Sequence, residues 1–248
     1  DGIRDLVLSL VGSEMCIRDR GYPAAGLGRY LTDTVEVVLS PGPITHRVRH
    51  YLNFVRKLGG DAFVKSHFEP PPLAPAPEVI RIALSPGSEY GATYQWPLAK
   101  MKEVVDGIDA RYAGVEWVIL GGGGNRACDD QAAELEAMLE VEVKNYAKEW
   151  DREKTMHALQ HCSALLACDG ELAHLAAHVG LPAAVIFGPN EPAWKRPLGK
   201  QSLVVREHVA CSPCYLARCP LDHRCQNDVT VEMVVAALEA ALAVRHSG

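Results

Sequence analysis

Residues 164–192, which read ALLACDGELAHLAAHVGLPAAVIFGPNEP, constrain the fold of this chain more than any other segment. A short apolar run meets a polar hinge, a stretch with helical spacing follows, and a Gly-Leu-Pro turn leads into a second apolar run. This order predicts a strand, a helix and a second strand. The two strands are expected to lie parallel in one sheet, because the helix returns the chain to the same edge.

The start of the helix in this segment is a candidate anion site. We expect the helix to begin at Asp169 and Gly170, with Asp169 as the N-cap. The first backbone N–H groups of a helix lack intrahelical partners, and a helix start at the carboxyl end of a parallel strand favours phosphate. His174 would lie one turn inside, where an imidazolium could donate to phosphate oxygens, although a plain cap with a surface histidine has the same spacing.

The same alternation of strand and helix patterns runs from residue 79 to residue 187. Short glycine-rich turns separate the segments, which predicts an α/β fold with a doubly wound parallel sheet. A closing amphipathic helix is expected near the carboxyl end. Ligands of such sheets bind beyond the carboxyl ends of the strands. The candidate loops there are residues 85–95, 121–129 and 168–174.

Charge and hydropathy narrow the classes of partner. The 248-residue chain has a formal net charge of -6, which argues against nucleic acid as a general partner. A phosphate-bearing small ligand is compatible with this charge, because a helix start can hold phosphate on an acidic protein. No apolar run reaches the roughly 18 residues that a membrane-spanning helix needs.

Four of the eight cysteines lie close together in the pattern C-x2-C-x4-C-x5-C. Four thiolates within this distance could hold a structural zinc ion, although the second pair is looser than in the usual zinc pattern. Reduced packing cysteines or a redox pair are the alternatives, and a reducing compartment suits either. The candidate ligands are Cys211, Cys214, Cys219 and Cys225.

Taken in order, four segments resemble glycosyltransferase family 9, the ADP-heptose:lipopolysaccharide heptosyltransferases and their relatives. They are SPGSEYGATYQWPLAKM, VILGGGGN, the strand–helix–strand segment described above, and CSPCYLARCP. The resemblance covers about residues 77–245 and is weaker over 40–70. It implies a GT-B architecture of two Rossmann-like domains, and inverting sugar transfer that requires no metal ion.

The resemblance also implies which residues contact the nucleotide-sugar donor. They are Ser85, Gly87, Ser88 and Tyr94 in the first loop, and Asp169, Gly170, Glu171 and His174 at the helix start. Two departures from the family pattern concern charge. Tyr94 and Gln95 precede Trp96-Pro97 where the family often has a lysine, and Glu171 replaces a small residue. Lys195, Arg196 and Lys200 could supply the missing cation, or they could form a solvated basic turn.

The resemblance gives the following domain organisation. Residues 78–228 form a nucleotide-sugar-binding domain and 229–248 a carboxyl-terminal helix. Residues 21–68 are the remnant of an amino-terminal acceptor domain, and the proline-rich residues 69–77 form a linker. Residues 1–20 resemble translated sequencing-adapter read-through, with a genuine amphipathic segment as the alternative.

The family implies transfer of a heptose-like sugar to a lipopolysaccharide-core or related glycan. The partners would be a nucleotide-sugar and a lipid-linked acceptor, in the cytoplasm at the inner face of the membrane. We find no acidic catalytic base in residues 1–40, so we expect this chain to be inactive by itself. The alternatives are another GT-B enzyme, such as a sugar-nucleotide epimerase, and a non-catalytic relative that binds a nucleotide or glycan.

Overall fold

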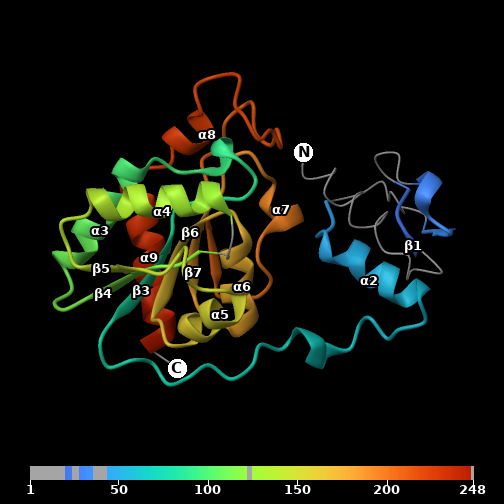
Figure 1. Cartoon of the computed structure of the whole chain (residues 1–248), viewed down its shortest axis with the longest axis horizontal. Coiled ribbons are helices and arrows are strands. Elements are labelled where there is room, and N and C mark those ends of the chain that lie inside the picture. Colours follow the sequence, from blue (N-terminus) through green and yellow to red (C-terminus); the bar gives the residue numbers. More distant parts are fainter. Residues whose placement is uncertain (1–19, 24–27, 36–43, 122–124, 247–248) are drawn as a thin grey trace. The chain divides into compact units, whose positions relative to one another are not determined.

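The computed structural model describes residues 20–23, 28–35, 44–121 and 125–246. The chain divides into two compact units, Asp1–Phe68 and Glu69–Gly248 (Figure 1). The suspected read-through, apart from Arg20, lies outside the described residues. Every candidate site residue named above belongs to the second unit.

The described part of the first unit is small. Strands β1 (Arg20–Gly21) and β2 (Asp33–Thr34) pair in parallel. Helix α2 (Val48–Lys57) is followed by a 3-10 turn, η2 (Lys65–Phe68). No side chain of α2 is fully buried, so this helix contributes little to a core within the described residues.

The second unit contains a six-stranded, wholly parallel sheet with the order β5-β4-β3-β6-β7-β8. This confirms the predicted doubly wound sheet. The direction of winding reverses between β3 and β6, so the crevice beyond their carboxyl ends is the expected ligand position. The strands are β3 (Arg81–Ser85), β4 (Glu116–Ile119), β5 (Val143–Asn145), β6 (Ala164–Cys168), β7 (Ala183–Ile186) and β8 (Ser202–Val205).

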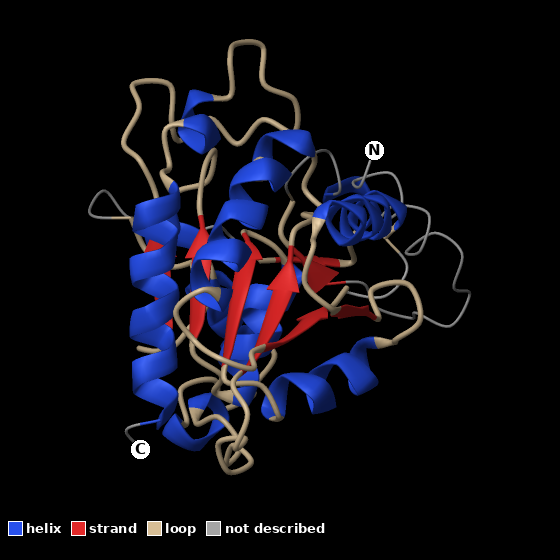
Figure 2. Ribbon diagram, turned by 90° about the vertical axis from the view of Figure 1, so that its left-hand side faces the viewer, coloured by secondary structure: helices blue, strands red, loops and turns tan. Residues whose placement is uncertain are grey.

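Helices cover both faces of this sheet (Figure 2). Apolar residues of α3 (Leu98–Asp109), α4 (Arg126–Met138) and α9 (Val231–His246) pack with Ile82 and Leu84 on one face. Those of α5 (Arg152–Gln160) and α6 (Glu171–Val179) pack with Ala83 on the other. Successive residues of a strand point to opposite faces, so a strand covered on both faces is apolar throughout.

The shorter elements of the second unit are η3 (Ala92–Tyr94), α7 (Pro192–Lys195) and α8 (Arg224–Asn227). They follow β3, β7 and β8 in the chain. The proline-rich residues 69–77 belong to the second unit, and the Arg245 guanidinium donates to the Ala74 carbonyl oxygen at 2.7 Å. Among the described residues, no helix has the length and apolar character to cross a bilayer.

Candidate functional site

The structure brings the three candidate loops together at the carboxyl ends of β3, β4 and β6. Together they line a cavity of about 90 Å³, which includes Ser85, Gly87, Gly121 and Glu171. The Ser88 hydroxyl donates a hydrogen bond to the Asp169 carbonyl oxygen at 2.6 Å and so joins the first loop to the third. The carboxyl edge at which ligands of such a sheet are expected therefore carries these loops, next to the reversal of winding between β3 and β6.

Gly87 allows α4 to approach the first loop closely. A Cβ atom at Gly87 would lie 2.7 Å from the Cα atom of Cys128. Helix α4 itself starts at this edge, where the Asn125 side chain accepts hydrogen bonds from the N–H groups of Ala127 and Cys128. These contacts indicate that Gly87 allows the loop after β3 to pack closely against α4.

Asp169 does not cap helix α6, so the expectation that it would is wrong. Its side chain turns inward, is 1% exposed, and accepts a short hydrogen bond from the Asn190 amide. The Tyr94 hydroxyl in turn donates to the Asn190 side-chain oxygen at 3.3 Å. Burial raises the pKa of Asp169 to about 6, against the lowering effect of the Asn190 hydrogen bond. Asp169 therefore belongs to a buried polar chain behind the helix start.

Gly170 is the N-cap residue of α6, and its backbone is extended. The cap is completed from another loop, because the Glu89 carboxylate accepts a hydrogen bond from the Glu171 backbone N–H at 3.2 Å. A Cβ atom at Gly170 would lie 2.9 Å from that carboxylate oxygen. At the helix start where the sequence predicts an anion, the chain's own Glu89 carboxylate therefore serves as the cap.

Glu171, whose charge departs from the family pattern, is paired. Arg152 at the start of α5 donates through Nε to a Glu171 carboxylate oxygen at 2.6 Å. This partner offsets the repulsion that an unpaired carboxylate would exert on a phosphate. His174 is half-buried on α6, one turn beyond the start, as its spacing predicted.

Tyr94 is buried rather than extended toward solvent, and burial raises its pKa to about 12. A cation does reach this edge, but from a different element. The Lys195 ammonium, at the end of α7, lies 3.7 Å from the centroid of the Tyr90 ring. It is also close enough to Asp169 for its charge to lower the pKa of that carboxyl group. From the sequence, Lys195 was one of three residues that could supply the missing cation, with Arg196 and Lys200.

The residues that the sequence did not single out are Glu89, Tyr90 and Asn190. Glu89 and Tyr90 lie inside the predicted first loop, and Asn190 follows the Gly-Pro pair after β7. Each makes its contact with a residue at least 82 positions away or in another loop. A local sequence pattern cannot identify partners that lie so far away. The only signal in the sequence was that these three residues follow the carboxyl ends of strands, where ligands of such sheets bind.

A second, larger cavity of about 950 Å³ lies along β4, β5 and α5. Its lining includes Arg81 and Glu116, the first residues of their strands, and the stacked rings of Tyr146 and Trp150. None of the sequence-predicted site residues lines it. We assign the candidate donor site to the smaller cavity, because the switch point and the helix start coincide there.

The four clustered cysteines are not arranged as a zinc site. Within the described residues, which include all four, no three His, Cys, Asp or Glu side chains form a group that could hold a metal ion. Cys225 is buried on α8 against Gly188, whereas Cys219 accepts a hydrogen bond from the Leu221 N–H. The expected ligands Cys211, Cys214, Cys219 and Cys225 are free thiols in this arrangement.

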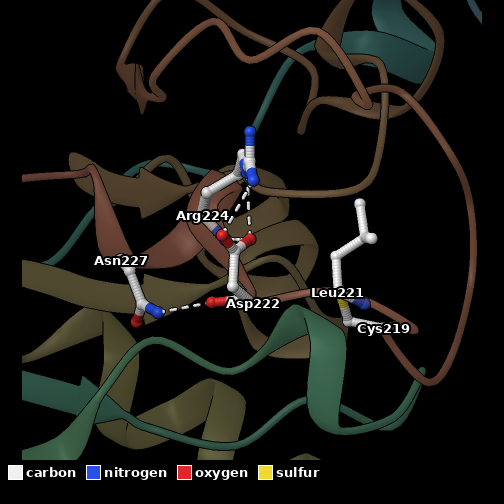
Figure 3. Close-up of polar contacts among 5 residues, drawn as sticks. All are labelled: Cys219, Leu221, Asp222, Arg224 and Asn227. Carbon is white, nitrogen blue, oxygen red and sulfur yellow. Dashed lines mark hydrogen bonds and ion pairs between the residues drawn. The ribbon is translucent and has the colours of Figure 1, made fainter.

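The cysteine-rich segment is held by contacts of its own, which Figure 3 shows. The Arg224 guanidinium donates to both carboxylate oxygens of Asp222 at 2.9 Å. The Asn227 amide donates to the Asp222 carbonyl oxygen at 2.7 Å. These bonds join Asp222 to the first and last residues of α8, Arg224 and Asn227.

Comparison with known proteins settles the family. The sequence family described as Glycosyltransferase family 9 (heptosyltransferase) matches residues 63–224. The chain belongs to glycosyltransferase family 9. The match spans the second unit from its proline-rich start to α8, so it includes every residue of the candidate donor site. The family predicted from the four sequence segments is thereby confirmed.

Individual relatives are more distant. Lipopolysaccharide heptosyltransferase 2 of Salmonella typhimurium is 26% identical over 126 residues, which are 50% of this chain and 36% of that protein. The solved structure of E. coli ADP-heptose lps heptosyltransferase II matches with a TM-score of 0.65 and 17% identity, over 99% of this chain and 75% of that one. The solved structure of E. coli heptosyltransferase WaaC with ADP matches with a TM-score of 0.56 and 19% identity, over 88% of this chain and 62% of that one.

These likenesses confirm the GT-B-type, Rossmann-like fold class of this family 9 member. The aligned part spans little more than a third of the length of the curated relative. At such identities, the solved structures establish the shared fold alone.

Proposed function

We propose that this chain is the nucleotide-sugar-binding part of a heptosyltransferase. The donor would be an ADP-linked heptose-like sugar, and the acceptor a glycan of the lipopolysaccharide core. One observation carries the proposal: the three loops of a family 9 chain meet at the start of α6, where backbone N–H groups favour an anion. The relative solved with ADP shares this fold and is itself a heptosyltransferase.

The donor diphosphate would take the position that Glu89 holds at the start of α6. The Glu171 N–H would then donate to a phosphate oxygen instead of to the carboxylate. In inverting transfer, an acceptor hydroxyl attacks the anomeric carbon while the bond from that carbon to the diphosphate breaks. Negative charge grows on the leaving diphosphate, so donors already aimed at it stabilise the transition state.

The proton of the acceptor hydroxyl must pass to a base, and we assign no such base among the described residues. A general base typically contributes about 10²–10⁴-fold to rate. We therefore propose that this chain binds the donor and transfers no sugar by itself. Transfer of heptose from ADP-heptose to a core acceptor by the isolated chain would contradict that part of the proposal.

We also propose a lipid-linked acceptor, which would place the complete protein at the cytoplasmic face of the inner membrane. The support is that the relatives are named as heptosyltransferases of lipopolysaccharide. The first unit would carry the acceptor side of the reaction. Binding of core glycan to the full chain, measured with and without residues 1–68, tests this assignment.

The central test is calorimetric titration of the full chain with ADP and with UDP. Tighter binding of ADP supports the proposal, tighter binding of UDP would favour a different GT-B enzyme such as an epimerase, and no binding would favour a non-catalytic relative. Gly170→Val should abolish ADP binding, because a branched side chain there crowds the start of α6. Trp150→Ala in the larger cavity is the matched control and should leave ADP binding unchanged.

A further inference from the structure

We infer that the loop between β8 and α8 carries a surface by which the second unit binds an anionic membrane. The surface is centred on residues 215–221, the apolar tip. The inference rests on the proposed function only for the lipid-linked acceptor, which gives the chain a reason to meet a bilayer. It does not depend on donor binding, which we assign to the cavity at the start of α6.

The apolar tip exposes large apolar side chains to solvent. Six such side chains are exposed in the described part of the second unit, and four of them lie between the start of α7 and the end of α8. One of the four is Leu198. The other three, Tyr215, Leu216 and Leu221, belong to the tip and are 45%, 45% and 60% exposed. Single exposed apolar residues are common, but their concentration on one segment is typical of a binding surface.

The same segment is basic, although the chain as a whole is acidic. Residues 192–227 contain six Lys or Arg and two Asp or Glu, a formal charge of +4, whereas the whole chain carries -6. Arg218 of the tip and Lys200 after α7 are both exposed, and Asp222 is paired with Arg224 (Figure 3). An apolar surface alone would also suit a protein partner. Positive charge beside it favours the anionic headgroups of a bilayer.

The backbone of the apolar tip is anchored at the carboxyl edge of the sheet. The N–H groups of Cys214 and Tyr215 donate to the Pro189 carbonyl oxygen, each at 3.0 Å. The Thr93 N–H donates to the Ala217 carbonyl oxygen at 3.3 Å. These bonds fix the tip to the loops after β7 and β3, so less conformational entropy is lost on binding. The candidate donor cavity lies at the same edge, so a membrane bound by the tip would lie near the donor.

Tyr215 has a backbone conformation that is unusual for a large residue. Its φ is +58°, in the left-handed region where the side chain crowds the backbone. One side of its ring packs edge-on against Trp194, with ring centroids 5.5 Å apart. Strained residues of this kind are typical of functional surfaces. Tyrosine is also enriched at membrane interfaces, where its ring lies among the headgroups.

The experiment is sedimentation of the full chain with vesicles of phosphatidylglycerol and phosphatidylethanolamine, and with vesicles of phosphatidylcholine alone. The parent should bind the anionic vesicles more tightly than the neutral ones, and added salt should weaken that binding. Replacing Leu216 and Leu221 together by serine should weaken it by about tenfold or more, because two leucines no longer enter the lipid. Arg218→Gln should weaken it by about fivefold, the size expected for one cation near an anionic surface.

Val79→Ser and Arg111→Gln are the matched controls. Val79 is 43% exposed just before β3, and the Arg111 side chain is 54% exposed just after α3, so both lie at the opposite, amino-terminal edge of the sheet. Both variants should bind anionic vesicles as the parent does. Chemical unfolding of every variant, with a midpoint equal to that of the parent, reports that the fold is retained.

Three results would overturn the inference. They are a parent that does not bind anionic vesicles, a parent that binds neutral vesicles equally well, and tip variants that bind as tightly as the controls. The last result would assign membrane binding to another surface. Calorimetric titration with ADP separates this inference from the proposed donor site. A parent that binds anionic vesicles through the tip but does not bind ADP would support the inference and refute the donor assignment.

Discussion

The Glu89 carboxylate accepts a hydrogen bond from the backbone N–H of Glu171, 82 residues further along the chain, at 3.2 Å. The contact gives α6 the cap that Gly170 cannot supply from its own side chain. It also places a negative charge where the proposed donor diphosphate would bind. Ligand binding at this site must therefore displace the carboxylate, and the cost of displacement lowers the observed affinity.

Replacing Glu89 by glutamine should strengthen ADP binding by about three- to tenfold, because the side chain keeps its size and loses its repulsion of phosphate. The same change should lower the free energy of unfolding by about 1 kcal/mol or less, since a charged cap at the helix start is lost. Calorimetry and chemical denaturation measure the two effects. Glu103→Gln, at an exposed position of α3, is the control, and equal affinities of Glu89→Gln and the parent would show that Glu89 does not compete with phosphate.

Arg152→Gln should weaken ADP binding several-fold while leaving stability nearly unchanged. The Arg152 side chain is 64% exposed, and an exposed ion pair contributes about 0–1 kcal/mol. Without this partner, however, the Glu171 carboxylate would face the phosphate with its full charge. Arg126→Gln, whose side chain is 95% exposed, serves as the comparison in the same titration. A large loss of stability together with unchanged ADP affinity would show that Arg152 stabilises the fold and does not assist ADP binding.

Asp169 should make the unfolding free energy fall as pH rises. Its pKa is about 6 in the folded protein and near 3.8 in the unfolded chain, so the folded state holds its proton more tightly. The resulting stability is fully present below about pH 4 and is lost as pH rises through about 6. Between pH 5 and pH 7 the parent should lose about 1 kcal/mol relative to Asp169→Asn.

Denaturant titrations of both proteins at pH 5, 6 and 7 test this pH dependence. Asp222→Asn is the control, because Arg224 lowers the pKa of the exposed Asp222 carboxyl to about 2 and that group stays ionised throughout. Parallel pH profiles for the parent and Asp169→Asn would show that Asp169 titrates normally in the folded chain.

Gly87 and Gly107 should respond in opposite ways to alanine. A Cβ atom at Gly87 would lie 2.7 Å from the backbone of Cys128 in α4, so Gly87→Ala should destabilise the chain by about 1–3 kcal/mol. Nothing lies within 4 Å of a Cβ atom at Gly107, inside α3. Gly107→Ala should therefore stabilise it by about 0.5–1 kcal/mol. Thermal or chemical unfolding of the two variants distinguishes the roles, and equal destabilisation would contradict this interpretation.

The sequence determined the sheet and the edge of it at which three loops meet. The parallel strands, the helix after Asp169 and the convergence of three loops follow from patterns with periods of two and about 3.6 residues, which act over neighbouring positions. The family resemblance came from the same local segments. The closing helix illustrates the accuracy of such patterns: it was expected over residues 229–248, and α9 spans Val231–His246.

Only the tertiary structure decided which groups meet at the site. Asp169 was expected to cap α6 but turns toward Asn190, while Glu89 provides the cap and Lys195 comes to the Tyr90 ring from α7. The four cysteines share a short stretch of sequence, but within the described residues no three metal-ligating side chains form a group that could hold a metal ion. The physical reason is common to all of these: side-chain partners in loops are fixed by how distant strands are ordered in the sheet, and sequence spacing carries no record of that order.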